Sequence, residues 1–199
     1  MTGPRVVLAT GHMVDLPDRD EPRFSADQVP RVTAEVRAAL EDWQVGPATT
    51  VVCGGARGAD LIVAEEAAAR GARITLCLAL PADQFVRTSV DVPGTDWAAR
   101  FARIAELAEV REPDGDGAAG DARSGDVFAR ANDRMVEVAR SVDPRPHVLV
   151  VWDGRDGDGP GGTADVARWL GPRLREPQVR VIDPTRCPGA RGGPGAPPG

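Results

Sequence analysis

The sequence contains no lysine, and all 24 of its basic residues are arginines. Enzymes that form a Schiff base on a lysine, and P-loop nucleotide hydrolases that hold phosphates with one, are therefore excluded. No stretch of 18 apolar residues is present, so we expect no transmembrane helix and no membrane partner. The opening residues MTGPRVVLATGH lack the features of a signal peptide, and we therefore expect a cytoplasmic protein.

Cysteine and histidine are also scarce. The three cysteines, Cys53, Cys77 and Cys187, are far apart and form no CxxC pair. An odd number without such a pair argues against a disulfide framework, and with only His12 and His147 besides, against a zinc site. Cys53 and Cys77 stand in apolar segments, where small core residues are expected. We predict no metal and no cofactor.

Acidic residues outnumber basic ones. The net charge is −6, and the sequence pI is near 5.0. This balance argues against nucleic acid or an anionic membrane as a nonspecific partner, although a local basic pocket is compatible with it. The length of 199 residues and the hydrophobic content of 42% suit one globular domain with a full core.

Short apolar segments rich in β-branched residues predict strands. They are RVVLAT (5–10), TTVVC (49–53), RITLCLA (73–79), HVLVVW (147–152) and QVRVI (178–182). Because these segments are continuous rather than alternating, they suit parallel strands buried on both faces. Helical periodicity lies between them, at 29–43, 59–70, 96–108, 126–141 and 163–170. In the first helix, Val29, Val32, Val36, Leu40 and Trp43 form one apolar stripe.

Strands and helices alternate along the chain, which predicts an α/β fold. We expect a Rossmann-like, doubly wound, mainly parallel sheet of about five strands with helices on both faces. The domain should span residues 1–183. Within it, the polar, glycine-rich segment 111–126 predicts a mobile loop, and the Gly/Pro-rich residues 184–199 predict a disordered tail.

Three loops leave strands at the carboxyl edge of the predicted sheet, where open α/β sheets bind their ligands. The second and third, GGARGAD (54–60) and the loop ending in GPGGT (159–163), are glycine-rich and lead directly into helices. Helix N-termini favour phosphate, and Arg57 could add a bidentate contact. The alternative is that each turn is only a tight connection, with Thr163 as a helix cap. The candidate ligand-binding residues are Thr10, Gly11, His12, Gly54, Gly55, Arg57, Gly58, Asp60, Gly161, Gly162 and Thr163.

Other patterns near this edge are less specific. Neither glycine turn is a GxGxxG in a first βαβ unit or a GxxxxGK[ST], which disfavours a standard NAD site and a P-loop. Asp153, Asp156 and Asp158 resemble a calcium loop, but the glutamate required at its twelfth position is absent. We interpret them as a solvated turn, with a ribose or Mg²⁺ contact as the alternative. His12 is a turn residue or a ligand contact, and Trp152 is a core residue or a surface on which a base stacks.

The motifs TGH, GGARGAD and GPGGTADV, in this order, resemble the SLOG superfamily of Rossmann-like nucleotide-binding domains. That superfamily joins the DNA-processing protein A (Smf) proteins and the LOG phosphoribohydrolases, and the likeness is nearest to a branch found alone or beside bacterial signalling modules. It covers most of residues 5–183. The resemblance implies a nucleotide or nucleotide-derived ligand at the carboxyl edge, and a homodimer.

The sequence departs from the LOG enzymes at the catalytic carboxylate. Gly161, Gly162 and Thr163 match the phosphate-binding part of the LOG signature Gly-Gly-x-Gly-Thr-x-x-Glu, but Val166 stands where the signature has Glu. The nearest acid, Asp165, is one residue away and therefore about 100° around the helix. For the arginine that LOG enzymes carry on the preceding helix, the sequence offers Arg134 or Asn132.

Two functions follow from this reading. The first is a sensor domain that binds a nucleotide and conveys its occupancy to a partner. The second is a hydrolase that splits a nucleoside 5′-monophosphate into base and ribose 5-phosphate, with Asp165 or Glu65 as the carboxylate that stabilises an oxocarbenium-like transition state. DNA binding, a third reading, is disfavoured by the acidic balance.

Overall fold

The computed structural model describes residues 3–113, 124–155 and 162–186. The strands are β1 (Val6–Gly11), β2 (Thr50–Cys53), β3 (Arg73–Cys77), β4 (Glu109–Arg111), β5 (His147–Val151) and β6 (Val179–Ile182). The α-helices are α1 (Val29–Asp42), α2 (Ala59–Ala68), α3 (Ala82–Phe85), α4 (Trp97–Ala105), α5 (Ser124–Val142) and α6 (Thr163–Leu170). Shorter helical turns are η1 (Ala26–Gln28), η2 (Val86–Val90), which is π-helical, and η3 (Gly171–Arg175).

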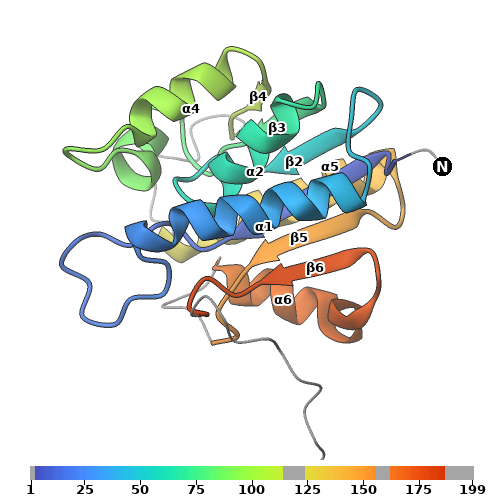
Figure 1. Ribbon diagram of the computed structural model, residues 1–199. Helices are drawn as coiled ribbons and strands as arrows, with labels where there is room; N and C mark the ends of the chain where they lie inside the picture. Colours follow the sequence, from blue (N-terminus) through green and yellow to red (C-terminus); the bar gives the residue numbers. More distant parts are fainter. Residues whose placement is uncertain (1–2, 114–123, 156–161, 187–199) are drawn as a thin grey trace, which may run out of the picture.

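The strands form one sheet in the order β4-β3-β2-β1-β5-β6, and every pair is parallel. The chain steps from β1 towards β4 and then returns to place β5 on the other side of β1 (Figure 1). The topological switch point, where such sheets most often bind ligands, therefore lies between the carboxyl ends of β1 and β5. This arrangement confirms the predicted α/β, Rossmann-like, doubly wound fold.

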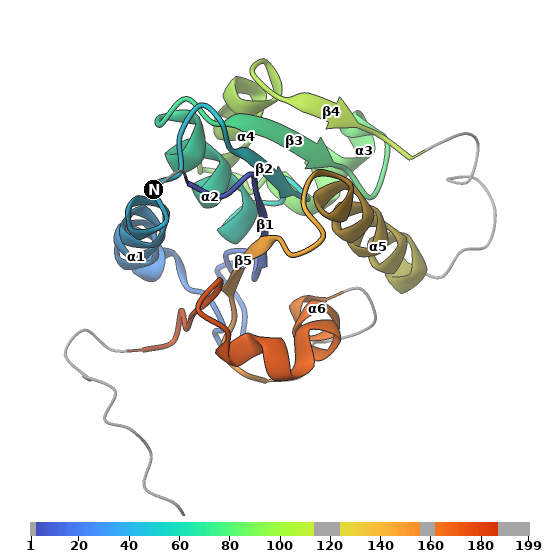
Figure 2. The same ribbon diagram turned by 90° about the vertical axis from the view of Figure 1, so that its right-hand side faces the viewer.

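Helices cover both faces of the sheet. Figure 2 shows α1 and α2 on one side and α5 and α6 on the other. The side chains of each strand divide accordingly: Val7 and Ala9 of β1 belong to the core under α1 and α2, whereas Val6 and Leu8 belong to the core under α5 and α6. Burial on both faces explains why the strands are continuous apolar runs.

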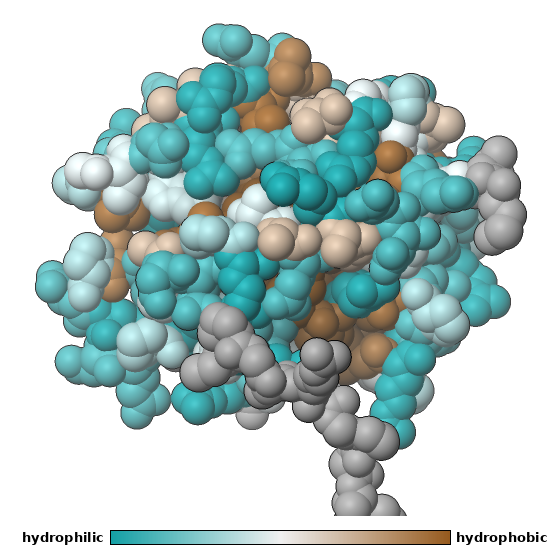
Figure 3. All heavy atoms as spheres, in the orientation of Figure 1, coloured by the Kyte–Doolittle hydropathy of each residue, from teal (hydrophilic) through white to brown (hydrophobic). Residues whose placement is uncertain are grey.

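The helices α1 and α2 differ in the pattern of their apolar residues because they are enclosed to different extents. In α1, three residues of the predicted stripe, Val32, Val36 and Leu40, are buried together with Ala39, whereas Val29 and Trp43 at its ends are half-buried. The helix α2 packs against both α1 and α4 as well as the sheet, and residues 59–64 are all buried. A helix that is enclosed on nearly every side must be apolar all round. The face of the molecule that Figure 3 shows, in the orientation of Figure 1, is mainly hydrophilic.

The structure corrects the predicted elements at three places. The sixth strand, β4, was missed because it has only three residues, all exposed, and so carries no apolar run. The helical segment 82–90 was also missed. The predicted mobile loop 111–126 is too long at both ends, since Arg111 lies in β4 and residues 124–126 lie in α5; residues 114–123 fall outside the described parts.

The start of the predicted tail is held against the domain. Arg31 of α1 donates hydrogen bonds from Nη2 to the backbone carbonyls of Asp183 (3.0 Å) and Pro184 (2.8 Å). Residues 184–186 thus belong to the folded part, and the rest of the tail, 187–199, lies outside the described residues. Of the helices that the structure describes, none is long and apolar enough to cross a membrane.

Candidate ligand-binding site

The first loop at the carboxyl edge follows β1 and makes hydrogen bonds to the end of β5 and to the start of α2. His12 follows β1 directly, and its backbone N–H donates to the carbonyl of Val151 (2.9 Å) at the end of β5. Its own carbonyl accepts a hydrogen bond from the N–H of Ala59 (3.1 Å) at the start of α2. The preceding residues, Thr10 and Gly11, form the end of β1 and pair with β5. These predicted site residues therefore do lie at the switch point.

Two glycines allow chain segments to meet here. A Cβ atom on Gly11 would lie 2.6 Å from the Cβ of Ala59 and 2.7 Å from the carbonyl oxygen of Val151. Gly58, which precedes α2, has φ +97°, and its Cβ would lie 2.6 Å from the backbone nitrogen of Val14. Only glycine fits a backbone position that is both left-handed and in contact with another segment. In this structure the close neighbour of both glycines is the protein itself.

In the turn 54–60, the side chain of Asp60 accepts hydrogen bonds from the backbone of the same turn. Oδ2 of Asp60 accepts a hydrogen bond from the N–H of Ala56 (3.2 Å), and the N–H groups of Gly54 and Gly55 also act on this carboxylate. A Cβ on Gly54 would lie 2.9 Å from the same Oδ2. The N–H of Arg57 donates to the carbonyl of Ser89 (3.0 Å), in the π-helical turn η2. The backbone donors that the sequence assigned to a phosphate are thus used within the chain.

Asp60 is buried without full compensation. Only 8% of the residue is exposed, and Oδ1 has no hydrogen-bond partner within the described residues. Burial raises the pKa of Asp60 to about 7, although the backbone N–H groups of Ala56, Gly54 and Gly55 oppose that rise. A carboxylate enclosed in an apolar environment favours its neutral form.

Arg57, the other charged side chain of this turn, is 6% exposed. Its Nε donates to the carbonyl of Val14 (2.9 Å) in the loop after β1. In the part of the chain that the structure describes, no hydrogen bond is found for its terminal nitrogens, Nη1 and Nη2. Burial lowers the pKa of Arg57, and the charge of nearby Asp15 opposes this, but a guanidinium remains protonated at neutral pH. Arg57 therefore holds a largely buried positive charge with donors to spare.

The switch point itself is filled by a second charged cluster. Arg23, from the loop after β1, donates from Nε and Nη2 to the two carboxylate oxygens of Asp153 (2.9 and 2.8 Å), just beyond β5. Nε2 of His12 lies 3.0 Å from Oδ1 of Asp153. The side chain of Asp153 is 1% exposed, that of Arg23 9% and that of His12 10%. This Arg23–Asp153–His12 cluster corrects the interpretation of Asp153 as part of a solvated turn.

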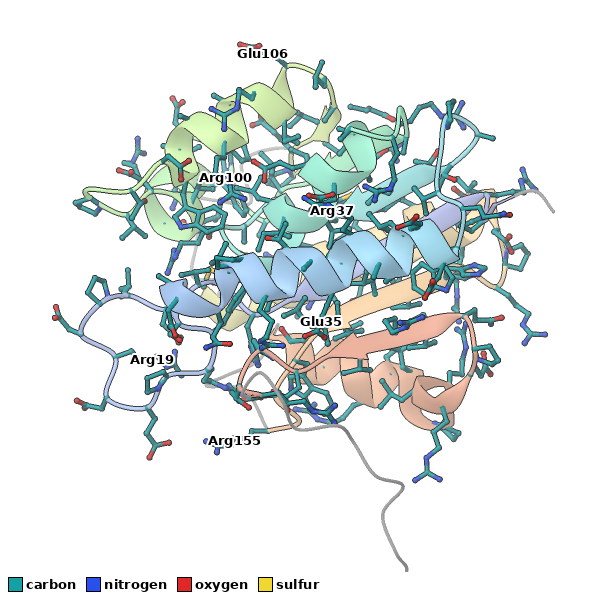
Figure 4. All side chains as sticks on the ribbon, viewed as in Figure 1. Arg19, Glu35, Arg37, Arg100, Glu106 and Arg155 are labelled. Carbon is teal, nitrogen blue, oxygen red and sulfur yellow. The ribbon has the colours of Figure 1, made fainter. Side chains whose placement is uncertain are left out.

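The charge states of this cluster follow from its contacts. Burial acts to raise the pKa of Asp153, but hydrogen bonds from Arg23, His12 and the backbone of Arg155 outweigh it and hold the pKa far below its usual range. Burial lowers the pKa of His12, and the hydrogen bond with Asp153 only partly offsets this. At neutral pH the cluster is an ionised Arg–Asp pair beside a neutral imidazole. The loops that supply it lie at the same end of the molecule, where Figure 4 labels Arg19 and Arg155.

The second glycine turn is described only in part. Gly161, Asp156 and Asp158 lie outside the described residues. Gly162 is described, and its carbonyl accepts the N–H of Asp165 (3.0 Å) in the first turn of α6. Thr163 begins α6 and is 8% exposed. Its role as a phosphate contact or as a cap stays a prediction.

The two candidate catalytic carboxylates are not brought together. Glu65 lies on α2 and accepts a hydrogen bond from Nε of Arg100 (2.9 Å) on α4, and this guanidinium stacks on Trp97, 3.9 Å from the ring centroid. Asp165 lies on α6, on the other face of the sheet, and pairs with Arg168 (2.6 Å). Each carboxylate is therefore engaged by an arginine on its own side of the molecule.

The remaining patterns bear on other chemistry. Trp152 is half-buried, and its Nε1 donates to the carbonyl of Arg155 (2.8 Å). Of the two candidates on α5 suggested by the resemblance, Arg134 has its Nη1 buried without a hydrogen-bond partner in the described chain. Asn132 lies half-buried on the same helix. The described residues contain no group of three or more His, Cys, Asp or Glu side chains that could hold a metal ion.

Comparisons with known proteins add little. No protein-family model matches the sequence, and no curated protein matches it. Among solved structures, the chain is similar to the X-ray structure of DNA processing protein A (DprA) from Streptococcus pneumoniae, with 13% sequence identity and a TM-score of 0.41. The likeness covers 91% of this chain and 59% of that one. The assignment of the fold therefore rests on the strand order and the parallel pairing observed here.

Proposed function

We propose that this protein binds a nucleotide or a nucleotide-derived anion, with Arg57 as the side chain that pairs with its phosphate. The observation that carries the proposal is that Arg57, which is 6% exposed as a residue, is anchored through Nε while Nη1 and Nη2 donate no hydrogen bond to the described residues. Burying a charge is costly unless it is paired, because the group loses its hydration. An anion that accepts from both terminal nitrogens would supply the missing partner.

The surroundings of Arg57 favour a small anion at a defined place. Its Nε is fixed on the carbonyl of Val14, so the direction of the guanidinium is set before any ligand arrives. Preorganisation of this kind lowers the entropic cost of binding. The site lies beside the switch point of a doubly wound sheet, where nucleotides are most often bound. Trp152, which follows β5 and is half-buried, is a candidate surface for the base.

We favour binding without cleavage. Hydrolysis of an N-glycosidic bond needs a carboxylate next to the sugar. Glu65 is held by Arg100 on α4, and Asp165 by Arg168 on α6, so neither carboxylate is directed towards Arg57 by the described contacts. A sensor that reports the presence of its ligand needs the anion site alone, and this function agrees best with the geometry.

The test is a thermal-shift screen of nucleoside monophosphates, cyclic nucleotides, NAD and ADP-ribose, followed by calorimetry on each ligand that stabilises the protein. We expect Arg57→Ala to weaken binding by about 1.5–3 kcal/mol, the usual loss for a hydrogen bond to a charged group. Arg87→Ala is the matched control, because Arg87 lies on η2 near the same edge but is exposed. Equal affinity of the Arg57→Ala variant and the wild type would contradict the proposal. Chromatography of the ligand after incubation would reveal a released base if the protein were a hydrolase.

A further inference from the structure

The strand β4 forms one edge of the sheet. It pairs with β3, and Figure 2 shows it at the outer margin of the sheet. All three of its residues, Glu109, Val110 and Arg111, are exposed. Leu107, which precedes the strand, is 72% exposed, so two of the exposed large hydrophobic side chains of the described residues, Leu107 and Val110, lie at this edge. An edge strand presents backbone groups that can pair with a strand of another chain.

The backbone groups of Val110 point away from the sheet. In a parallel ladder, alternate residues direct both their N–H and their C=O towards the same neighbouring strand. The carbonyl of Arg111 accepts a hydrogen bond from the N–H of Leu78 (2.9 Å), just beyond the end of β3. Arg111 therefore directs its backbone groups to β3, and so does Glu109, two residues earlier. Val110, between them, presents its N–H and C=O to the free edge.

The side chains on either side of Val110 carry opposite charges. Nε and Nη2 of Arg111 lie 3.0 and 2.9 Å from Oε1 of Glu109, and these side chains are 43% and 61% exposed. Oε2 of Glu109 and Nη1 of Arg111 form no hydrogen bond within the described residues. The first can therefore accept, and the second can donate, a hydrogen bond across the edge.

We propose that β4 pairs in the antiparallel direction with β4 of a second copy of this chain, with Val110 at the two-fold axis. In this register, the N–H of Val110 donates to the carbonyl of the partner's Val110, and the partner's N–H donates back. Glu109 then stands opposite the partner's Arg111. Because a two-fold interface repeats each contact, the second ion pair forms at the other end of the strand. The two six-stranded sheets become one continuous sheet.

The order of the charges selects a second copy as the occupant of this edge. Charges of one sign on an edge strand oppose pairing, and many proteins prevent edge-to-edge association in this way. The sequence Glu-Val-Arg instead complements itself when it is turned about Val110. A parallel copy in the same register would place like charges opposite each other, which is unfavourable. A strand of another protein would need the same order of charges, whereas a second copy always carries it.

The interface should be weak and sensitive to salt. Pro113 has no N–H and ends the segment that can pair, so only a few backbone hydrogen bonds can form. Interfaces this small are typical of transient complexes. The ion pairs across the edge are exposed to solvent, and salt screens them. We therefore expect a dimer that dissociates in the upper micromolar range. It does not depend on the proposed anion site, because the turn 54–60 contributes no residue to β4.

The test is sedimentation velocity of the full chain, from low micromolar to millimolar concentration, with two charge-reversal variants. Arg111→Glu makes both charged side chains of the edge acidic, and Glu109→Arg makes both basic, so each variant alone should dimerise at least about tenfold more weakly than the wild type. In an equimolar mixture every pair across the edge again has opposite charges, and association should return. Arg180→Glu is the matched control, because Arg180 lies on the other edge strand, β6, is 42% exposed and also pairs with an acid, Asp42. It should dimerise like the wild type.

A second variant tests the backbone pairing. Val110→Pro removes the N–H that faces the free edge and keeps the N–H groups of Glu109 and Arg111, so β4 should stay in the sheet while the dimer is lost. Circular dichroism checks the fold. A wild type that stays monomeric to millimolar concentration would overturn the inference, and so would a dimer that neither Val110→Pro nor the charge reversals weaken. If the wild type dimerised and the mixed charge variants did not associate, the register about Val110 would be wrong.

Discussion

Two charged clusters lie at the same edge of the sheet and differ in how completely they are paired. The Arg23–Asp153–His12 cluster fills the switch point between β1 and β5, with the carboxylate oxygens of Asp153 each accepting from the guanidinium at 2.8–2.9 Å. One strand along, in the turn after β2, Arg57 and Asp60 are buried to a similar degree but do not pair with each other. In one cluster the protein satisfies its own charges, and in the other it does not.

The difference separates a structural role from the proposed binding role. A buried ion pair whose members satisfy each other fixes the loop after β1 onto β5, and a ligand there would first have to break it. Buried charges with unused hydrogen-bonding capacity are rare in proteins and call for a ligand, a proton or water. Fold-level reasoning alone would place the ligand at the switch point, whereas the pairing of charges moves the candidate anion contact to the turn after β2.

The largest effect should follow from breaking the paired cluster. Arg23→Ala leaves Asp153 as a buried, unpaired charge, and we expect the free energy of unfolding to fall by about 3–5 kcal/mol. Chemical denaturation followed by circular dichroism measures this. Arg19→Ala is the control, because Arg19 is in the same loop but its side chain is 34% exposed, and its loss should cost less than about 1 kcal/mol. If the two variants were equally stable, the switch-point cluster would not be the anchor described here.

Removing the charges of both Arg23 and Asp153 tests whether the cost of Arg23→Ala comes from the unpaired charge of Asp153. In Arg23→Met/Asp153→Asn no ionised group of this cluster is left buried, so the double variant should be more stable than Arg23→Ala alone.

The fold was predictable because the strands that form the core of this sheet are continuous apolar segments of the sequence. Five strands and the main helices followed from such segments and from the periodicity of α1. The sixth strand did not, because Glu109, Val110 and Arg111 are exposed at the sheet edge and are held there by backbone pairing with β3. A strand that is held mainly by backbone hydrogen bonds cannot be detected from the hydropathy of its side chains.

The site was predictable only in its position. The first glycine turn does stand at the carboxyl edge, but the sequence could not show that Asp60 folds back onto Gly54 and Ala56. Nor did any local pattern indicate Arg23, whose partner Asp153 is 130 residues away. One signal could have been used: Asp153 stands directly beyond an apolar strand. At such a position an aspartate that pairs with a buried cation is as reasonable an expectation as an aspartate in a solvated turn.

A second, smaller effect concerns stability in the unpaired cluster. The pKa of Asp60 is about 7 in the folded protein and close to its ordinary value of 3.8 when unfolded, so the folded state binds the extra proton between these values. Stability should therefore fall as the pH rises from about 4 to about 8, by about 4 kcal/mol from this group, and stay level above. Asp60→Asn should remove this pH-dependent contribution, so the stability of the variant relative to the wild type should increase towards pH 8.

The measurement is the difference in unfolding free energy between the wild type and Asp60→Asn at several pH values. The difference cancels the titration of other carboxylates, such as Asp153, whose stabilising contribution is lost at acid pH instead. A difference that is constant from pH 5 to pH 8 would show that Asp60 is ionised throughout and that its environment is less apolar than its burial indicates.

The smallest effect belongs to the exposed end of α2. The side chain of Glu65 is 28% exposed and pairs with Arg100, so Glu65→Gln should lower the free energy of unfolding by about 1 kcal/mol or less. Nucleotide binding should not change, because α2 places this residue two turns away from the turn that carries Arg57. Glu66→Gln is the matched control, since Glu66 pairs with Arg37 and Arg70 at 14% exposure. Loss of nucleotide cleavage in Glu65→Gln, with cleavage kept in Glu66→Gln, would contradict the sensor and place a hydrolase carboxylate on this helix.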